Sequence, residues 1–214
     1  MVFYDGVTSY SGFKQQSEWL AGFLQRECNV RRGDRVALFM QNCPQFVIAY
    51  YAILRADAAV VPINCMNLSG ELSHVLRDAG AKVVIAAQDL YSRIEPLLGD
   101  PVQHAVIACY SDYVGSEPQS VIPESIAAPR LSFGSSQVTL WHDALSRHLT
   151  PGVHESTPDD LCVIPYTSGT TGAPKGCMHR HRGVAVSRRA RHRSAWKVCN
   201  ARSLSGGRAA GWEA

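Results

Sequence analysis

Short, continuous runs of apolar residues alternate along this chain with segments in which apolar residues recur at helical spacing. Runs of this kind indicate strands that are buried on both faces, since half-exposed strands alternate apolar with polar residues. The apolar runs lie at 36–40, 58–63, 82–87, 104–109 and 161–165. The helical segments lie at 11–24, 44–54, 69–79, 90–98 and 141–148. This order predicts an α/β fold with a mainly parallel sheet and helices on both faces.

Local signals mark the ends of several expected elements. Two β-prone runs around Asp5 and Gly6 predict a hairpin over residues 2–10. Ser11 and Ser69 are expected to cap the helices that follow them, because a serine hydroxyl can accept a bond from a free helix N–H group.

Other segments interrupt these patterns. Asp57 stands where a helix ends in a left-handed residue, and we interpret it as a substitute for glycine without functional meaning. Residues 111–136 are rich in Ser, Gly and Pro and show no period, which predicts a loop. Five isolated histidines are interpreted as surface or packing residues: His74, His104, His142, His148 and His154.

Charge divides the 214-residue chain into two unlike parts. Residues 1–179 hold 12 Lys and Arg against 17 Asp and Glu, whereas residues 180–214 hold 9 against 1. The second part is rich in Arg, Ala, Gly and Ser and has no sustained period. It therefore predicts a basic tail that does not share the fold of the first part.

The remaining composition indicates a cytoplasmic protein. Its seven cysteines include no C-x-x-C pair, which favours reduced thiols over disulfides or a zinc site. The longest apolar stretch, 46–63, contains Arg55, Asp57 and Pro62, so no membrane span is expected. The N-terminus lacks the basic-then-apolar pattern of a signal peptide.

The candidate chemistry lies in residues 166–176, which read Y-T-S-G-T-T-G-A-P-K-G and follow the apolar run 161–165. Glycines let backbone N–H groups approach phosphate oxygens, hydroxyls add short donors, and a lysine adds a mobile positive charge. The spacing is not G-x-x-x-x-G-K-[ST], because Pro174 stands where that pattern requires glycine. The residues expected to bind polyphosphate are Thr167, Ser168, Gly169, Thr170, Thr171, Gly172 and Lys175.

In this stretch the chain resembles the adenylate-forming (AMP-binding) superfamily. Residues 167–176 match its phosphate loop, T-S-G-T-T-G-x-P-K-G, at every fixed position. Residues 31–37 match a second sequence motif that is common in this superfamily, R-x-G-D-R-V-A. The residues flanking the loop are most similar to the acyl-CoA synthetase, or fatty-acid–CoA ligase, branch. The resemblance extends over residues 2 to 182.

The resemblance implies that residues 1–179 are a partial AMP-binding N-terminal domain ending just after the phosphate loop. The loop residues would cradle the β- and γ-phosphates of ATP. Mg²⁺ and coenzyme A would be the other cofactors, and a carboxylic acid, a fatty acid in this branch, would be the substrate. The family's catalytic lysine and its Mg²⁺-binding glutamate belong to downstream parts without a counterpart here. No catalytic or metal-binding residue is therefore assigned, and we expect a truncated, inactive ligase.

Two interpretations of residues 180–214 remain. The favoured one is an out-of-frame tail, because an excess of Arg, Ala, Gly and Ser is what GC-rich DNA encodes in a shifted frame. The rival interpretation of the tail is a basic nucleic-acid arm. For the function of the whole chain, the alternative to a truncated ligase is a non-enzymatic module that binds nucleotide phosphates or a partner, with the basic tail recruited for contact. Nucleic acid is not expected as a partner, since the tail has no interleaved aromatic residues and no recognisable binding fold.

Overall fold

The computed structural model of this chain describes residues 1–167 and 173–185. Its central feature in these residues is a seven-stranded sheet in the order β11-β8-β4-β3-β5-β6-β7. The strands are β3 (Arg35–Phe39), β4 (Ala59–Pro62), β5 (Val83–Ala87), β6 (His104–Ala108), β7 (Val138–Leu140), β8 (Leu161–Val163) and β11 (His179–Arg180). Six of them pair in parallel, and β11 pairs antiparallel with β8 at one edge. The predicted mainly parallel sheet is confirmed.

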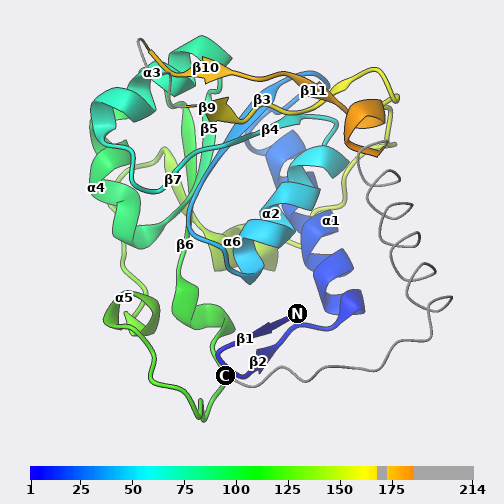
Figure 1. Cartoon of the computed structure of the whole chain (residues 1–214). Helices are drawn as coiled ribbons and strands as arrows, with labels where there is room; N and C mark the ends of the chain where they lie inside the picture. The colour runs from blue at the N-terminus through cyan, green and yellow to red at the C-terminus, as the bar shows by residue number, and fades with distance from the viewer. Residues whose placement is uncertain (168–172, 186–214) are drawn as a thin grey trace, which may run out of the picture.

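Helices cover both faces of this sheet, as the continuous apolar strands require. In β3, Val36 and Leu38 face one apolar cluster, whereas Ala37 and Phe39 face the other. The first cluster lies under α1 (Tyr10–Arg26), α2 (Pro44–Arg55) and α6 (Trp141–Ser146). The second lies under α3 (Ser69–Ala79) and the turns η1 (Gln88–Leu90), α4 (Tyr91–Ile94) and η2 (Glu95–Leu97). Figure 1 shows α1 and α2 on one side of the sheet and α3 and α4 on the other.

Both predicted helix caps are wrong, because in each case a residue one or two positions earlier in the chain occupies the capping position. Ser9, not Ser11, caps α1, and its hydroxyl accepts a hydrogen bond of 3.0 Å from the Gly12 N–H group. Leu68, not Ser69, precedes α3, and its N–H group donates to the Glu71 carboxylate at 3.0 Å. Several hydroxyls lie close together before α1, at Thr8, Ser9 and Ser11, whereas Ser69 is the one beside the start of α3. The path of the preceding chain decides which group reaches the helix end.

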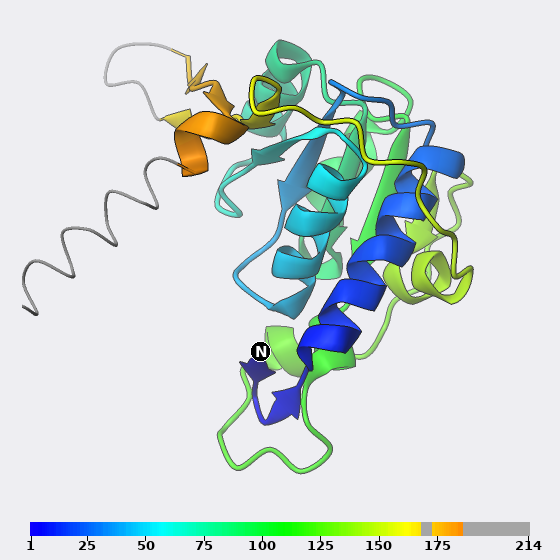
Figure 2. The same ribbon diagram turned by 90° about the vertical axis from the view of Figure 1, so that its right-hand side faces the viewer.

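The hairpin at the N-terminus is present as β1 (Val2–Phe3) and β2 (Gly6–Val7), and Figure 2 shows it beside the start of α1. The loop predicted for 111–136 contains two short elements, the end of η3 (Tyr110–Tyr113) and α5 (Glu124–Ala127). The edge strand β7 was not predicted. It has only three residues, too few to show a period, and it forms because β6 offers backbone partners, with Ala105 opposite Val138.

Asp57 has the expected left-handed conformation, with φ of 62°. Its side chain does more than replace a glycine. It is buried, and it accepts hydrogen bonds from the N–H groups of Glu155 and Ser156 and from the Ser156 hydroxyl. His154 Nδ1 lies 2.7 Å from the same carboxylate. Asp57 therefore fastens the segment that leads into β8, a structural role that the sequence analysis did not predict.

Candidate functional site

The predicted phosphate loop leaves the sheet at the carboxyl end of β8. The Ile164 N–H group donates to the Val60 carbonyl at 2.9 Å, which extends the pairing of β8 with β4. The chain then forms a hairpin of β9 (Tyr166–Thr167) and β10 (Lys175–Gly176), which pair antiparallel. Cys177 N–H closes the base by donating to the Pro165 carbonyl at 2.9 Å. Parallel α/β sheets bind ligands at the carboxyl ends of their strands.

Two of the seven predicted site residues lie in the described part of the chain. Thr167 and Lys175 are opposite one another in the β9–β10 pair, and both are exposed. The hairpin thus brings the first and last residues of the predicted set together. The other five, Ser168, Gly169, Thr170, Thr171 and Gly172, lie outside the described residues.

Gly176 permits a close approach inside this hairpin. A Cβ atom at this position would fall 2.9 Å from Ile164 Cγ2 and 3.1 Å from Tyr166 Cζ. Real Cβ atoms do not pack so closely against carbon, so any larger residue would displace the Tyr166 ring. The final glycine of the motif therefore has a packing role in the hairpin.

Helix α3 supplies two contacts that sequence reasoning missed. The Tyr166 hydroxyl donates to Asp78 Oδ2 at 2.5 Å, and His74 Nε2 lies 3.2 Å from the Pro174 carbonyl oxygen. His74 was interpreted as an isolated surface or packing residue, yet it contacts the predicted loop. No local signal could have found these pairs, because 88 and 100 residues separate their members.

The chain after the hairpin is fixed to the segment before β8. His181 N–H donates to the Asp160 carbonyl at 3.1 Å, and Arg182 N–H donates to the Pro158 carbonyl at 2.9 Å. The Arg182 guanidinium also pairs with Asp159. The first residues of the predicted basic tail, including β11, therefore pack against the sheet edge next to the hairpin.

Asp160 gives this region a pH dependence that can be measured. Its carboxylate accepts from the Thr157 N–H group at 2.6 Å and from Arg32 at 2.7 Å. The Thr157 bond first, and then Arg32, lower the pKa of Asp160 to about 2. The ionised form thus stabilises the fold at pH values above the ordinary aspartate pKa of about 3.9, and this contribution is lost as pH falls toward 2.

We expect Asp160→Asn to be less stable than the unmodified chain at pH 6, with the difference shrinking between pH 4 and 2. Urea unfolding across this range measures it, and a difference independent of pH would contradict the assignment.

The structure offers no protein cluster for a metal ion among its described residues. No group of three or more His, Cys, Asp or Glu side chains in residues 1–167 and 173–185 is arranged to hold a metal ion. A hard cation such as Mg²⁺ is commonly held by one or two carboxylates together with substrate phosphates.

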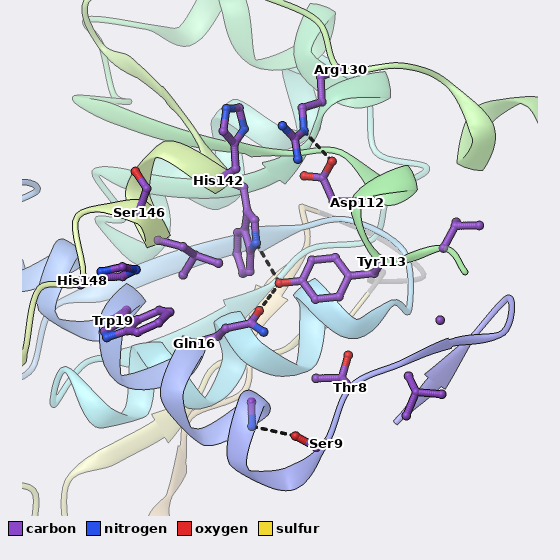
Figure 3. A pocket seen from close by; sticks show the side chains of 16 residues that line it. Thr8, Ser9, Gln16, Trp19, Asp112, Tyr113, Arg130, His142, Ser146 and His148 are labelled. Carbon is purple, nitrogen blue, oxygen red and sulfur yellow. Dashed lines mark hydrogen bonds and ion pairs between the residues drawn. The ribbon is translucent and has the colours of Figure 1, made fainter. Parts of the chain in front are cut away.

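A cavity of about 630 Å³ lies away from the hairpin, between the β1–β2 hairpin, α1, η3 and α6. Figure 3 shows several of its polar groups paired with one another. The Trp141 indole N–H donates to the Tyr113 hydroxyl at 3.1 Å, and that hydroxyl donates to Gln16. Arg130 pairs with Asp112 at 2.6 Å at the rim. The cavity is lined in part by residues that come after β6 and β7 in the chain. By strand spacing, β6 lies roughly 19 Å across the sheet from β8, so we do not assign the phosphate chemistry to this cavity.

Fold and site together define a class of α/β proteins that carry a hydroxyl- and glycine-rich loop at the carboxyl edge of a parallel sheet. The comparison with protein families identifies a particular family. The sequence profile of the family described as "AMP-binding enzyme" matches residues 1–205, which extends beyond the boundary at 179 predicted above. The chain belongs to this family.

Several individual relatives are long-chain-fatty-acid–CoA ligases. A long-chain-fatty-acid–CoA ligase of Escherichia coli is 30% identical over 193 residues, covering 85% of this chain and 33% of the relative. The Bacillus subtilis enzyme of the same name is 32% identical over 176 residues, covering 78% of this chain and 31% of the relative. The chain therefore spans about a third of the length of these relatives.

Solved structures agree with the fold. The inhibitor-bound N-terminal domain of FACL13 from Mycobacterium tuberculosis superposes with a TM-score of 0.59 at 29% identity, covering 81% of this chain and 37% of that one. A long-chain-fatty-acid-CoA ligase from Archaeoglobus fulgidus gives a TM-score of 0.61 at 26% identity, covering 81% and 30%. Among the described residues, no helix has the length and apolar character needed to cross a membrane.

Proposed function

We propose that this chain is the phosphate-loop-bearing N-terminal part of an ATP-dependent acyl-CoA ligase that acts on a fatty acid. The observation that carries the proposal is the β9–β10 hairpin, which brings Thr167 and Lys175 together, exposed, at the carboxyl edge of the sheet. Family membership and the fatty-acid–CoA ligase names of the relatives support this choice of reaction and substrate.

The reaction has two steps. In the first, the carboxylate oxygen of the acid attacks the α-phosphorus of ATP, the bond between the α- and β-phosphates breaks, and pyrophosphate leaves. In the second, the thiolate of coenzyme A attacks the acyl carbon and AMP leaves. The first step brings two anions together and builds negative charge on the departing pyrophosphate. Fixed donors and a positive charge at that position lower the barrier, because they need no reorganisation during the step.

This chain's residues would hold the outer phosphates. Lys175 supplies a point charge beside Thr167, whose hydroxyl is a donor at the opposite strand position. Mg²⁺, bound by the triphosphate, would neutralise part of its charge. The complete set assigned to the β- and γ-phosphates is Thr167, Ser168, Gly169, Thr170, Thr171, Gly172 and Lys175. No residue of the chain is assigned to the acyl transfer itself, and we propose that the chain alone does not turn over.

The test is MgATP binding by the purified chain, measured by isothermal titration calorimetry. We expect Lys175→Ala to weaken binding by about tenfold or more, because a bond between charged groups is lost. Lys14→Ala is the matched control, since Lys14 is also exposed but lies on α1, and it should leave the affinity unchanged.

The same preparation tests the absence of turnover. Incubation with ATP, Mg²⁺, a long-chain fatty acid and coenzyme A should give no AMP above background. AMP formation that Lys175→Ala abolishes would show that the chain is itself a ligase. Equal MgATP affinity in the unmodified chain and Lys175→Ala would contradict the assignment of the loop. The alternative of a non-enzymatic module with a recruited basic tail gains no support from the comparisons.

A further inference from the structure

Helix α3 is a fixed support beside the phosphate-loop hairpin. Its inner face is held in the core by Leu72, Val75 and Leu76, each with 0% of its surface exposed. Figure 1 shows α3 next to β10 at the same end of the molecule. A side chain that reaches from α3 to the hairpin therefore ties the hairpin to the rigid core.

Two side chains on one face of α3 make such ties, one to each limb of the hairpin. His74 and Asp78 are four residues apart, which places them one turn apart on the same side of a helix. Asp78 accepts from the hydroxyl of Tyr166 in β9 at 2.5 Å. His74 Nε2 lies 3.2 Å from the carbonyl oxygen of Pro174, which enters β10.

Each tie falls directly before a proposed phosphate-binding residue. Tyr166 precedes Thr167, and Pro174 precedes Lys175. Because Thr167 and Lys175 are cross-strand partners, fixing the residue before each of them also fixes how their side chains are presented. Without these ties, a hairpin of two-residue strands would depend on few bonds of its own.

The chemistry of both bonds is well defined. The Pro174 carbonyl can only accept, so His74 must carry a hydrogen on Nε2. Burial in the first place, and then Asp78, raise the pKa of Tyr166, so its hydroxyl keeps its proton and donates. The Tyr166 ring also packs on Gly176, so displacement of the hydroxyl would be transmitted to β10.

We propose that His74 and Asp78 are positioning residues that set the separation and orientation of Thr167 and Lys175 for a nucleotide triphosphate. They act through Pro174 and Tyr166 and need not touch the nucleotide. The second part of this proposal, that the two contacts affect phosphate binding, rests on the proposed function. Its first part, that α3 holds the hairpin, stands on the contacts alone.

The test compares five variants of the full chain by two readouts. His74→Ala and Asp78→Ala remove the ties, whereas His74→Gln keeps an N–H donor and Asp78→Asn keeps an oxygen acceptor. Arg77→Ala is the matched control, because Arg77 lies on the same helix but pairs with Asp100 at 2.9 Å. The readouts are amide hydrogen exchange at residues 166–167 and 175–177, and the Kd for MgATP.

We expect each alanine variant to exchange about fivefold faster at these amides and to bind MgATP about fivefold more weakly, the size of one hydrogen bond. Amides of β3 and β5 should not change. The Gln and Asn variants should recover most of both effects, and Arg77→Ala should show neither.

Unchanged exchange at the hairpin in both alanine variants would overturn the proposal whatever the nucleotide affinity. An equal effect of Arg77→Ala would also overturn it, since general loosening of α3 would then be the cause. If exchange rises but MgATP affinity stays the same, the link to phosphate is wrong. If the unmodified chain fails to bind MgATP, the proposed function and that link fall together, and the exchange result alone decides whether α3 holds the hairpin.

Discussion

Replacing Gly22 with alanine should destabilise the fold by about 3 kcal/mol, although alanine is the better helix former. Gly22 is buried in α1, where the segment 149–152 crosses the helix. A Cβ atom there would fall 2.8 Å from the Thr150 carbonyl carbon and nearer still to the Leu149 carbonyl group. The obstacle is backbone, held by Arg26 and Gln25 through bonds of 3.0 and 2.8 Å, so it cannot rotate away.

Gly70→Ala is the matched control, because it makes the same change in another helix. Gly70 lies in the first turn of α3, is exposed, and has nothing within 4 Å of the Cβ position. It should stabilise the fold by about 0.5 kcal/mol through helix propensity. Urea unfolding gives both values from the midpoint at constant slope. Equal effects of the two substitutions would show that the 149–152 segment does not cross α1 as described.

Replacing Asp57 with alanine should cost about 3 kcal/mol, because it removes a buried carboxylate with several partners. The N–H groups of Glu155 and Ser156 would lose their acceptor, and His154 would lose its ion-pair partner. Alanine also tolerates a φ of 62° less well than aspartate does. The loss should appear as a lower urea midpoint.

Two further variants separate the causes. Asp57→Asn tolerates the left-handed conformation and keeps one acceptor oxygen, so it should cost less than the alanine variant. Asp57→Gly removes the strain but also the carboxylate, and it should remain clearly destabilised. If Asp57→Gly were as stable as the unmodified chain, the side-chain bonds to 155 and 156 would contribute nothing, and only backbone conformation would matter.

The predicted sheet followed from apolar runs that are legible in the sequence. β5, and β3 after its half-buried Arg35, are buried on both faces, so these residues had to be apolar, and a run of this kind is hard to confuse with a surface element. The short elements were less predictable. β7 has three residues, and its existence depends on the free edge of β6. The helix expected to end at 148 ends at Ser146 in α6, a difference within the fraying of helix ends.

The candidate site also has one part that the sequence predicts and another that it does not. The residues proposed to bind phosphate fall within ten consecutive positions, so the sequence by itself is enough to propose this stretch as the site. The ties from α3 could not be proposed in that way, because His74 and Asp78 become neighbours of the hairpin only after β4, β5 and β8 are placed in one sheet. A lone histidine in a helical segment carries no local mark of such a contact.

The sequence by itself determined the properties that reside in contiguous residues: the α/β class, the buried strands β3, β4, β5, β6 and β8, and the family. It also contains the motif on which the proposed phosphate loop rests. Tertiary structure alone decided the properties that join distant segments. It made Asp57 an anchor for residues 154–156, set the opposite effects expected for alanine at Gly22 and Gly70, and brought α3 to both limbs of the hairpin. The physical reason is that periodicity and turn chemistry are local, whereas burial and side-chain bonding depend on which segments the sheet brings together.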